Sequence, residues 1–227
     1  MSRLFRLHGG DLVDSVDAVD LHDYSGSLAT LGDKLETVRR TLRRPLPIWI
    51  TETSVPGDPR ANAAWDAERQ AGALVRHLAA ALSTGVVPRI FWHTLGDSPP
   101  NPGRREWRAF GTNALYDCFQ PLRNAQGHQV CQDRRRKPVG EVFARLNELL
   151  RDYTRVEAWD ARTVVFRRDG QPPWVAAWRD RGTQPVDLRR WFGDGRVRVQ
   201  LATAGLPETL EDAGSVPVGM VPVLVTR

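Results

Sequence analysis

Side chains capable of chemistry stand at the ends of three short apolar runs in this sequence. His22 and Tyr24 lie in the stretch LHDY, Glu52 lies in WITETS, and Trp92 and His93 lie in IFWHT. A carboxylate can act as a nucleophile, a phenol can donate a hydrogen bond to it, and an imidazole can bind hydroxyl groups. The flat apolar face of an indole can support a ring-shaped ligand. These five residues form one candidate site if the three runs are neighbouring strands.

The segments between the apolar runs predict helices. Apolar residues recur at steps of three and four over residues 28–42 and again over 62–83, which is the spacing of amphipathic helices. Gly85 is well placed to end the second helix. A further helix is predicted to begin at Pro138, and the segment 95–137 is predicted to be a long loop.

Strand and helix therefore alternate three times, which predicts parallel strands with helices outside them. In such a domain the functional groups gather at the carboxyl ends of the strands. We therefore expect His22, Tyr24, Glu52, Trp92 and His93 to converge on one mouth. Residues that alternate along a strand point to opposite faces, so the residue between His22 and Tyr24 is expected to point away from that mouth.

The pattern of apolar and polar residues changes after residue 151. Short runs rich in valine and tryptophan, such as TVVFRR and PWVAAWR, are separated by turn signals such as RDGQPP. Apolar residues do not recur there at helical spacing, and the pattern predicts a small antiparallel sheet or sandwich. We place a domain boundary near residue 152, which divides the chain into residues 1–151 and 152–227.

The residue types of the candidate site suit a carbohydrate. A carboxylate can attack or stabilise an anomeric carbon whose transition state resembles a cation. A tyrosine hydroxyl that donates to this carboxylate keeps it ionised and oriented. The face of Trp92 suits the C–H side of a pyranose ring, and the His22 imidazole can bind sugar hydroxyls.

The order of these motifs resembles a known family. LHDY, WITETS and IFWHT look like the ends of the sixth, seventh and eighth strands of the (β/α)8-barrel retaining glycoside hydrolases, the clan of cellulase-, mannanase- and β-xylosidase-like enzymes. ALYD followed by KPVGEVFARL resembles the approach to the last helix of that barrel, and residues 152–227 resemble its appended β-sandwich. The resemblance implies an α/β fold: an incomplete TIM-type (β/α) barrel, its last three βα units, followed by a small antiparallel β-sandwich.

The same resemblance implies roles for the candidate residues. Glu52 would be the nucleophile and Tyr24 the residue that orients it. His22 would contact the substrate, Trp92 would form the sugar platform, and His93 is grouped with these substrate-binding residues. The implied partner is a glycoside or an oligo- or polysaccharide, and the implied reaction is hydrolysis of an O-glycosidic bond with retention of configuration.

A general acid/base is the part of this machinery that the sequence lacks. The family carries it on the fourth strand in an Asn-Glu pair, and Asn147–Glu148, the sole such pair here, falls inside the last predicted helix. Asp23, Asp97 and Glu106 are the possible substitutes, and we expect ordinary structural carboxylates at all three. A complete barrel takes about 250 residues. The expectation is a chain without its acid/base, little turnover by this chain alone, and a missing N-terminal half-barrel as partner.

The sequence also bears on an alternative function, on other partners and on localisation. A non-catalytic carbohydrate-binding or interaction remnant is the alternative, so whether the chain is an enzyme stays open. The net charge is +5, but most arginines are interleaved with acidic residues, so no nucleic-acid partner is expected. No apolar run is long enough to span a membrane, and the first residues lack the core of a signal peptide. The chain as it stands would remain in the cytoplasm, and its localisation is otherwise unknown.

Neither a cofactor nor a metal is expected. No glycine-rich phosphate loop follows a strand. Cys118 and Cys131 lack the second pair that a cysteine-based zinc site needs. The two could form a disulfide or remain thiols, and the sequence leaves both open.

Overall fold

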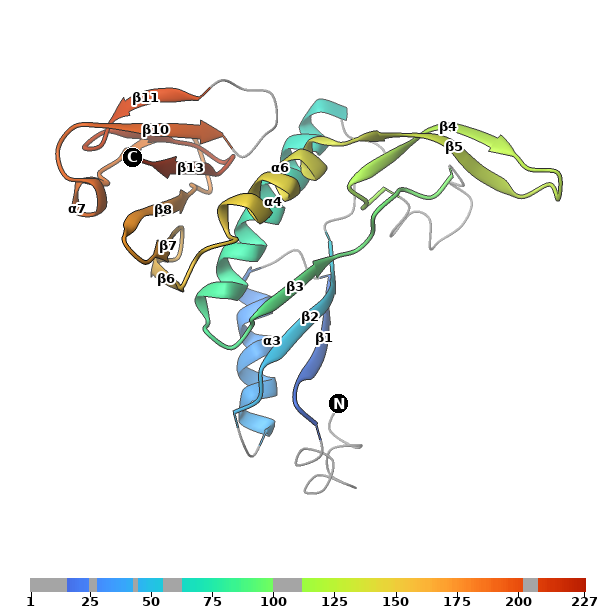
Figure 1. Ribbon diagram of the computed structural model, residues 1–227, viewed down its shortest axis with the longest axis horizontal. Coiled ribbons are helices and arrows are strands. Elements are labelled where there is room, and N and C mark those ends of the chain that lie inside the picture. Colours follow the sequence, from blue (N-terminus) through green and yellow to red (C-terminus); the bar gives the residue numbers. More distant parts are fainter. Residues whose placement is uncertain (1–15, 25–27, 43–44, 55–62, 100–111, 202–207) are drawn as a thin grey trace.

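A three-stranded parallel sheet forms the first part of the chain (Figure 1). In chain order its strands and helices are β1 (Val19–Asp23), α3 (Leu28–Thr41), β2 (Ile48–Thr53), α4 (Ala63–Ser83) and β3 (Arg89–Trp92). The computed structural model describes residues 16–24, 28–42, 45–54, 63–99, 112–201 and 208–227. Strand β2 lies between β1 and β3 and is parallel to both. The predicted alternation of strand and helix is confirmed for these elements.

Helices α3 and α4 cover one face of this sheet. Leu21 of β1 and Ile48 and Ile50 of β2 are buried there, and they share one hydrophobic cluster with Leu31 and Leu35 of α3. Burial of each such side chain stabilises the fold by roughly 1.5–3 kcal/mol. The opposite face is more open, and it is the face on which polar side chains of the strand tips lie.

Strand β2 carries one extra residue just before Glu52. Leu21 pairs with Ile50 but His22 pairs with Glu52, so Thr51 has no partner of its own in β1. Strict alternation after the buried Ile50 would have turned Glu52 toward the helices. A bulge re-aims the side chains that follow it, so Glu52 lies on the open face and Thr53 is buried beneath.

A β-hairpin occupies much of the segment that the sequence predicted to be a loop. Strands β4 (Tyr116–Arg123) and β5 (Gln129–Arg136) pair antiparallel, and the hairpin projects away from the sheets (Figure 1). Both strands expose most of their side chains, so no alternation of apolar and polar residues revealed them. A disulfide between Cys118 and Cys131, with Cα atoms 5.4 Å apart, joins the strands and settles the question that the sequence left open.

An antiparallel sheet follows helix α6 (Pro138–Leu149), as the sequence predicted. Its six strands are, in spatial order, β11 (Thr209–Asp212), β10 (Arg196–Leu201), β13 (Val223–Thr226), β8 (Gln171–Ala177), β7 (Thr163–Arg168) and β6 (Arg155–Asp160). Strands β9 (Gln184–Val186) and β12 (Val216–Val218) form a separate pair, and a short helix, α7 (Arg189–Phe192), follows β9.

One hydrophobic cluster joins this sheet to the helices. Leu74 of α4 and Leu146 of α6 share it with Phe166 of β7, Ala176 of β8 and Leu224 of β13. Figure 1 shows α4 and α6 side by side between the parallel and the antiparallel sheet. The two sheets are therefore linked through a common core, and the domain boundary near residue 152 stays a prediction.

Candidate active site

The Glu52 carboxylate is the centre of a small polar cluster at the tips of β1 and β2. The Tyr24 hydroxyl donates a hydrogen bond of 2.5 Å to Glu52 Oε2, and His22 Nδ1 lies 3.3 Å from the same oxygen. Glu52 Oε1 makes no hydrogen bond or ion pair with the residues that the structure describes. The described side chains therefore hold one oxygen of the carboxylate and leave the other without a contact to them.

Tyr24 is built to remain a hydrogen-bond donor. Burial, and then the hydrogen bond to Glu52 and the negative charge of Glu52, raise the pKa of Tyr24 far above that of an ordinary phenol. The phenol ring also makes an edge-to-face contact with the imidazole of His93, with ring centroids 5.8 Å apart. Tyr24 thus connects the predicted nucleophile with the end of strand β3.

Trp92 and His93 reach the same edge of the sheet through strand pairing. Trp92 is the register partner of Thr53, the residue after Glu52, and the His93 N–H donates to the Thr53 carbonyl at 2.8 Å. The indole Nε1–H of Trp92 donates to the backbone oxygen of Asn113 at 2.9 Å, which fixes the orientation of the half-buried ring. The peptide bond between His93 and Thr94 is cis. The structure thus brings all five predicted residues to neighbouring strand ends, and their roles stay predictions.

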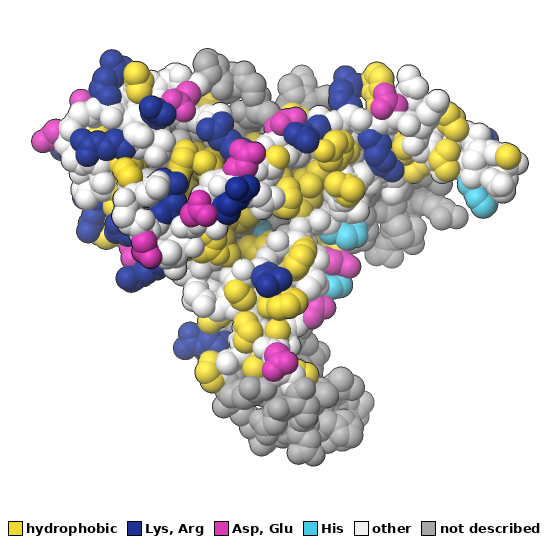
Figure 2. All heavy atoms as spheres, in the orientation of Figure 1, with side chains coloured by type: hydrophobic (Ala, Val, Ile, Leu, Met, Phe, Trp, Pro, Cys, Tyr) yellow, Lys and Arg dark blue, Asp and Glu magenta, His cyan; other side chains and the backbone are white. Residues whose placement is uncertain are grey.

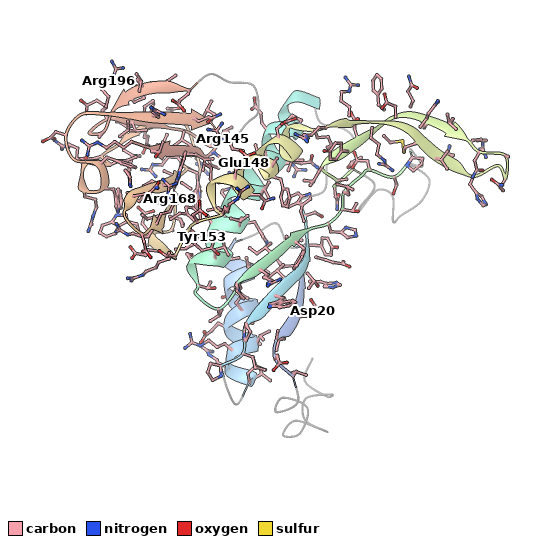
Figure 3. The ribbon with its side chains drawn as sticks, viewed as in Figure 1. Asp20, Arg145, Glu148, Tyr153, Arg168 and Arg196 are labelled. Atoms are coloured by element: carbon pink, nitrogen blue, oxygen red, sulfur yellow. A yellow bond between two sulfur atoms is a disulfide. The ribbon has the colours of Figure 1, made fainter. Side chains whose placement is uncertain are left out.

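The open face around this cluster is charged and accessible. His22 and Glu52 expose 49% and 36% of their side chains, and His22 Nε2 lies 3.5 Å from Asp20 Oδ2. The hydroxyl of Thr51, the bulge residue, also donates a hydrogen bond to the Asp20 carboxylate. Figure 2 shows histidine side chains beside acidic side chains along this flank of the molecule, and Figure 3 shows Asp20 at the same sheet. A polar ligand could therefore approach Glu52 from solvent.

A second polar cluster lies on the buried side of the same strand tips. Asp23 is fully buried, and its carboxylate pairs with Lys34 Nζ of α3 at 2.5 Å and with His77 Nε2 of α4 at 3.5 Å. His77 Nε2 also hydrogen-bonds the Thr53 hydroxyl at 2.9 Å. Asp23 therefore points away from His22 and Tyr24, as the alternation along the strand predicted.

His77 gives the fold a pH dependence whose direction can be stated. Burial lowers the pKa of His77 from 6.5, the nearby charge of Asp23 opposes this shift, and that of Lys34 adds to it. The unfolded chain therefore binds a proton below about pH 6.5 that the folded chain does not. We expect the free energy of unfolding to fall as the pH drops through this value, by at most ~1.4 kcal/mol per pH unit for this group.

Urea unfolding between pH 5 and 8 measures this slope. His77→Gln is expected to flatten it, whereas His128→Gln, which changes an exposed histidine of the hairpin, should leave it as it is. Equal slopes in the wild type and in His77→Gln would contradict the assignment.

Of the carboxylates considered as proton donors, Asp97 is bound by other groups. Burial raises the pKa of Asp97, while Lys137 and the Ala114 N–H, which both bind its carboxylate, counter this rise. Glu148 lies on α6, inside the helix as predicted, well away from Asp20 and the parallel sheet (Figure 3), and it is exposed. Glu106 lies outside the described residues. Within the described part of the chain, none of the candidates is placed as a general acid for Glu52.

The described ranges contain no group of three histidine, cysteine, aspartate or glutamate side chains that could hold a metal ion. No helix among them is both long and apolar enough to span a membrane.

Sequence reasoning missed several residues that support the site. His77 interrupts the apolar face of α4 between Val75 and Leu78, and a polar residue at such a position could have signalled a buried contact. Asn113 gave no signal, because it lies in an irregular segment. Its side-chain amide donates to Ser54 Oγ at 2.7 Å, and its backbone oxygen accepts from the Trp92 indole. Asn113 therefore links the end of β2 to Trp92.

Comparison with known proteins gives structural relatives only. No protein-family model and no curated protein matches the chain. It is similar to a family 39 glycoside hydrolase from the gut symbiont Bacteroides cellulosilyticus WH2, with a TM-score of 0.62, 16% sequence identity, and 98% of this chain and 46% of that chain covered. It also matches SrfJ from Salmonella typhimurium, with a TM-score of 0.48, 15% identity, and 98% and 44% covered. A glucosidase from Croceicoccus marinus matches with a TM-score of 0.48, 15% identity, and 93% and 54% covered.

The first of these similarities establishes the fold. At 16% identity and a TM-score of 0.62, the chain has a mixed α/β, glycoside hydrolase-like fold. The chain spans about half of the length of each structure that it matches. Activity does not follow from a fold alone, since function resides in the site.

Proposed function

We propose that this protein is a retaining glycoside hydrolase in which Glu52 is the nucleophile. The observation that carries the proposal is the contact of Tyr24 and His22 with Glu52 Oε2, at 2.5 and 3.3 Å, on the open face of the strand tips. It leaves Oε1 for the reaction. The glycoside hydrolase-like fold supports a glycosidic substrate for this arrangement.

In the first step, Glu52 Oε1 forms a bond to the anomeric carbon as the bond to the leaving-group oxygen breaks. The bonding electrons leave with that oxygen, which takes a proton from an acid or departs as an anion. The Tyr24 hydroxyl holds Oε2 throughout and keeps the carboxylate oriented. Water then cleaves the glycosyl ester with a second inversion, so that the configuration is retained. We assign contacts with the sugar ring to Trp92, His22 and His93.

The fold proposal extends the parallel sheet to a barrel. We propose that residues 1–151 form the last three βα units of a (β/α)8 barrel and that residues 152–227 form an accessory β-sandwich. An N-terminal half-barrel would supply the general acid/base. This chain alone should therefore cleave ordinary glycosides slowly or not at all.

A substrate that needs no acid tests the nucleophile separately. Dinitrophenyl 2-deoxy-2-fluoro-glycosides carry a leaving group that departs without protonation, and the fluorine slows hydrolysis of the ester. We expect the chain to release up to one equivalent of dinitrophenolate and to gain the mass of one fluoro-sugar. Peptide mapping should place this mass on Glu52.

The outcomes separate the two candidate functions. A panel of fluoro-glycosides covers the choice of sugar, with Glu52→Gln as the unreactive control. Labelling at Glu52 supports the proposal. Labelling elsewhere, or none with any sugar, overturns it. A third outcome would favour the carbohydrate-binding alternative. In it no fluoro-glycoside labels the chain, and calorimetry detects sugar binding that Glu52→Ala retains and Trp92→Ala loses.

A further inference from the structure

We propose that the buried Asp23, His77 and Thr53, together with the half-exposed Lys34, form a positioning device that aligns Glu52 with Tyr24. The inference rests on the proposed role of Glu52. It assigns a function to four residues that lie behind the strand tips and touch no substrate.

The register of the strands couples the two clusters. Asp23 pairs with Thr53, and their neighbours His22 and Glu52 pair with each other on the open face. Adjacent residues of a strand point to opposite faces. Holding Thr53 from behind therefore sets the direction of Glu52, and holding Asp23 sets the directions of His22 and Tyr24.

The bulge in β2 gives this support a role. Beyond Thr51 the pairing of β2 departs from regular register with both β1 and β3. A bulge locally interrupts the ladder of backbone hydrogen bonds, so a side-chain contact adds to the restraint that the His93 N–H gives Thr53. The hydrogen bond of 2.9 Å between His77 and Thr53 supplies this contact from α4.

Burying these polar groups costs stability that a purely structural core of apolar residues would not lose. Asp23 and Thr53 are 0% and 2% exposed, and apolar residues of similar size would often be at least as stable at such positions. A buried carboxylate held by an ion pair to the half-exposed Lys34 and by directed hydrogen bonds instead selects one geometry, which is the requirement of a nucleophile whose partner must donate at 2.5 Å. Lys34 neutralises the Asp23 charge from α3, so both covering helices hold the strand tips.

Thr53→Val is the sharpest test because it removes one hydroxyl and keeps the shape. Thr163→Val is the matched control: Thr163 is 1% exposed, lies in the antiparallel sheet, and its hydroxyl donates to Asp160 Oδ2 at 3.3 Å. Both variants lose one buried hydroxyl contact, so their losses of stability should be similar. Thr53→Ser restores the hydroxyl. Should Thr53→Val not fold, Thr53→Ala removes the same group.

Two readouts report on the site itself. The first is the rate of Glu52 labelling by the fluoro-glycoside, which we expect to fall by about 10-fold or more in Thr53→Val, since small misplacements of reacting groups have effects of this size. The second is the chemical shift of the Tyr24 ring in ring-labelled protein at neutral pH, with Tyr24→Phe to assign the signal. A displaced Glu52 weakens the hydrogen bond from the phenol, so the Tyr24 signal should move toward that of a solvent-exposed tyrosine.

The inference holds if Thr53→Val changes both readouts while Thr163→Val and Thr53→Ser remain near the wild type. It is overturned if Thr53→Val and Thr163→Val behave alike in both. Should the wild type take no label from any sugar, the proposed function fails while the Tyr24 chemical shift still decides whether Thr53 positions Glu52.

Discussion

Replacing Glu52 with glutamine is expected to abolish the burst of dinitrophenolate from activated glycosides. The amide has the size of the carboxylate but is a poor nucleophile, and Tyr24 would lose the charged acceptor of its hydrogen bond. Loss of the nucleophile from a well-studied serine protease lowers the rate by roughly 10⁶-fold. Stopped-flow absorbance of the first turnover measures the effect directly.

Asp20→Asn is the matched control for this variant. Asp20 also lies on the open face and also contacts His22, but the structure gives it no contact with the Glu52 carboxylate. We expect its burst rate to change by less than about 10-fold, as for a charge that does not take part in bond formation. A normal burst in Glu52→Gln, or equal losses in the two variants, would remove Glu52 from the role of nucleophile.

Rescue by azide distinguishes a nucleophile from an acid/base residue at position 52. If Glu52 is the nucleophile, its replacement in Glu52→Ala opens space below the anomeric carbon, where azide can attack and displace dinitrophenolate. The product should be a glycosyl azide of inverted configuration, identified by its NMR coupling constants. Rescue with retained configuration would instead assign Glu52 to the acid/base role.

Phe166→Ala is expected to destabilise the whole chain by about 3–5 kcal/mol, the range for an aromatic residue removed from a core. Phe166 is 3% exposed and belongs to the cluster that contains residues of α4, α6, β7 and β8. The lost contacts and the resulting cavity therefore affect both sheets at once. Since domains are typically stable by only 5–15 kcal/mol, the shift in the unfolding midpoint should be large.

Phe119→Ala serves as the control because Phe119 is 47% exposed on the hairpin, where it is in contact with the Arg135 guanidinium. Its loss should cost no more than about 1 kcal/mol. Urea unfolding followed by hydrogen exchange distinguishes the possible behaviours. A single transition that includes α3 and the antiparallel sheet is expected. An antiparallel sheet that unfolds alone, while α3 remains protected, would show that the common core does not couple them.

Local pattern predicted most of the first half of the fold. The apolar spacing of α3 and α4 and the continuous runs of β2 and β3 placed those elements correctly, because burial on one face or on both leaves a direct mark in the sequence. The hairpin β4–β5 left no such mark. Its strands are mostly exposed, and a disulfide joins them in place of an apolar core.

The sequence by itself determined which chemical groups stand at the strand ends, since His22, Tyr24, Glu52, Trp92 and His93 follow apolar runs that had to be strands. Only the tertiary structure decided how they face one another. Strict alternation from Ile50 would have buried Glu52, and the extra residue Thr51 turns it to the open face. Such a bulge depends on pairing with β1 and β3 and on contacts from α4, which are distant in sequence, so no local pattern could reveal it.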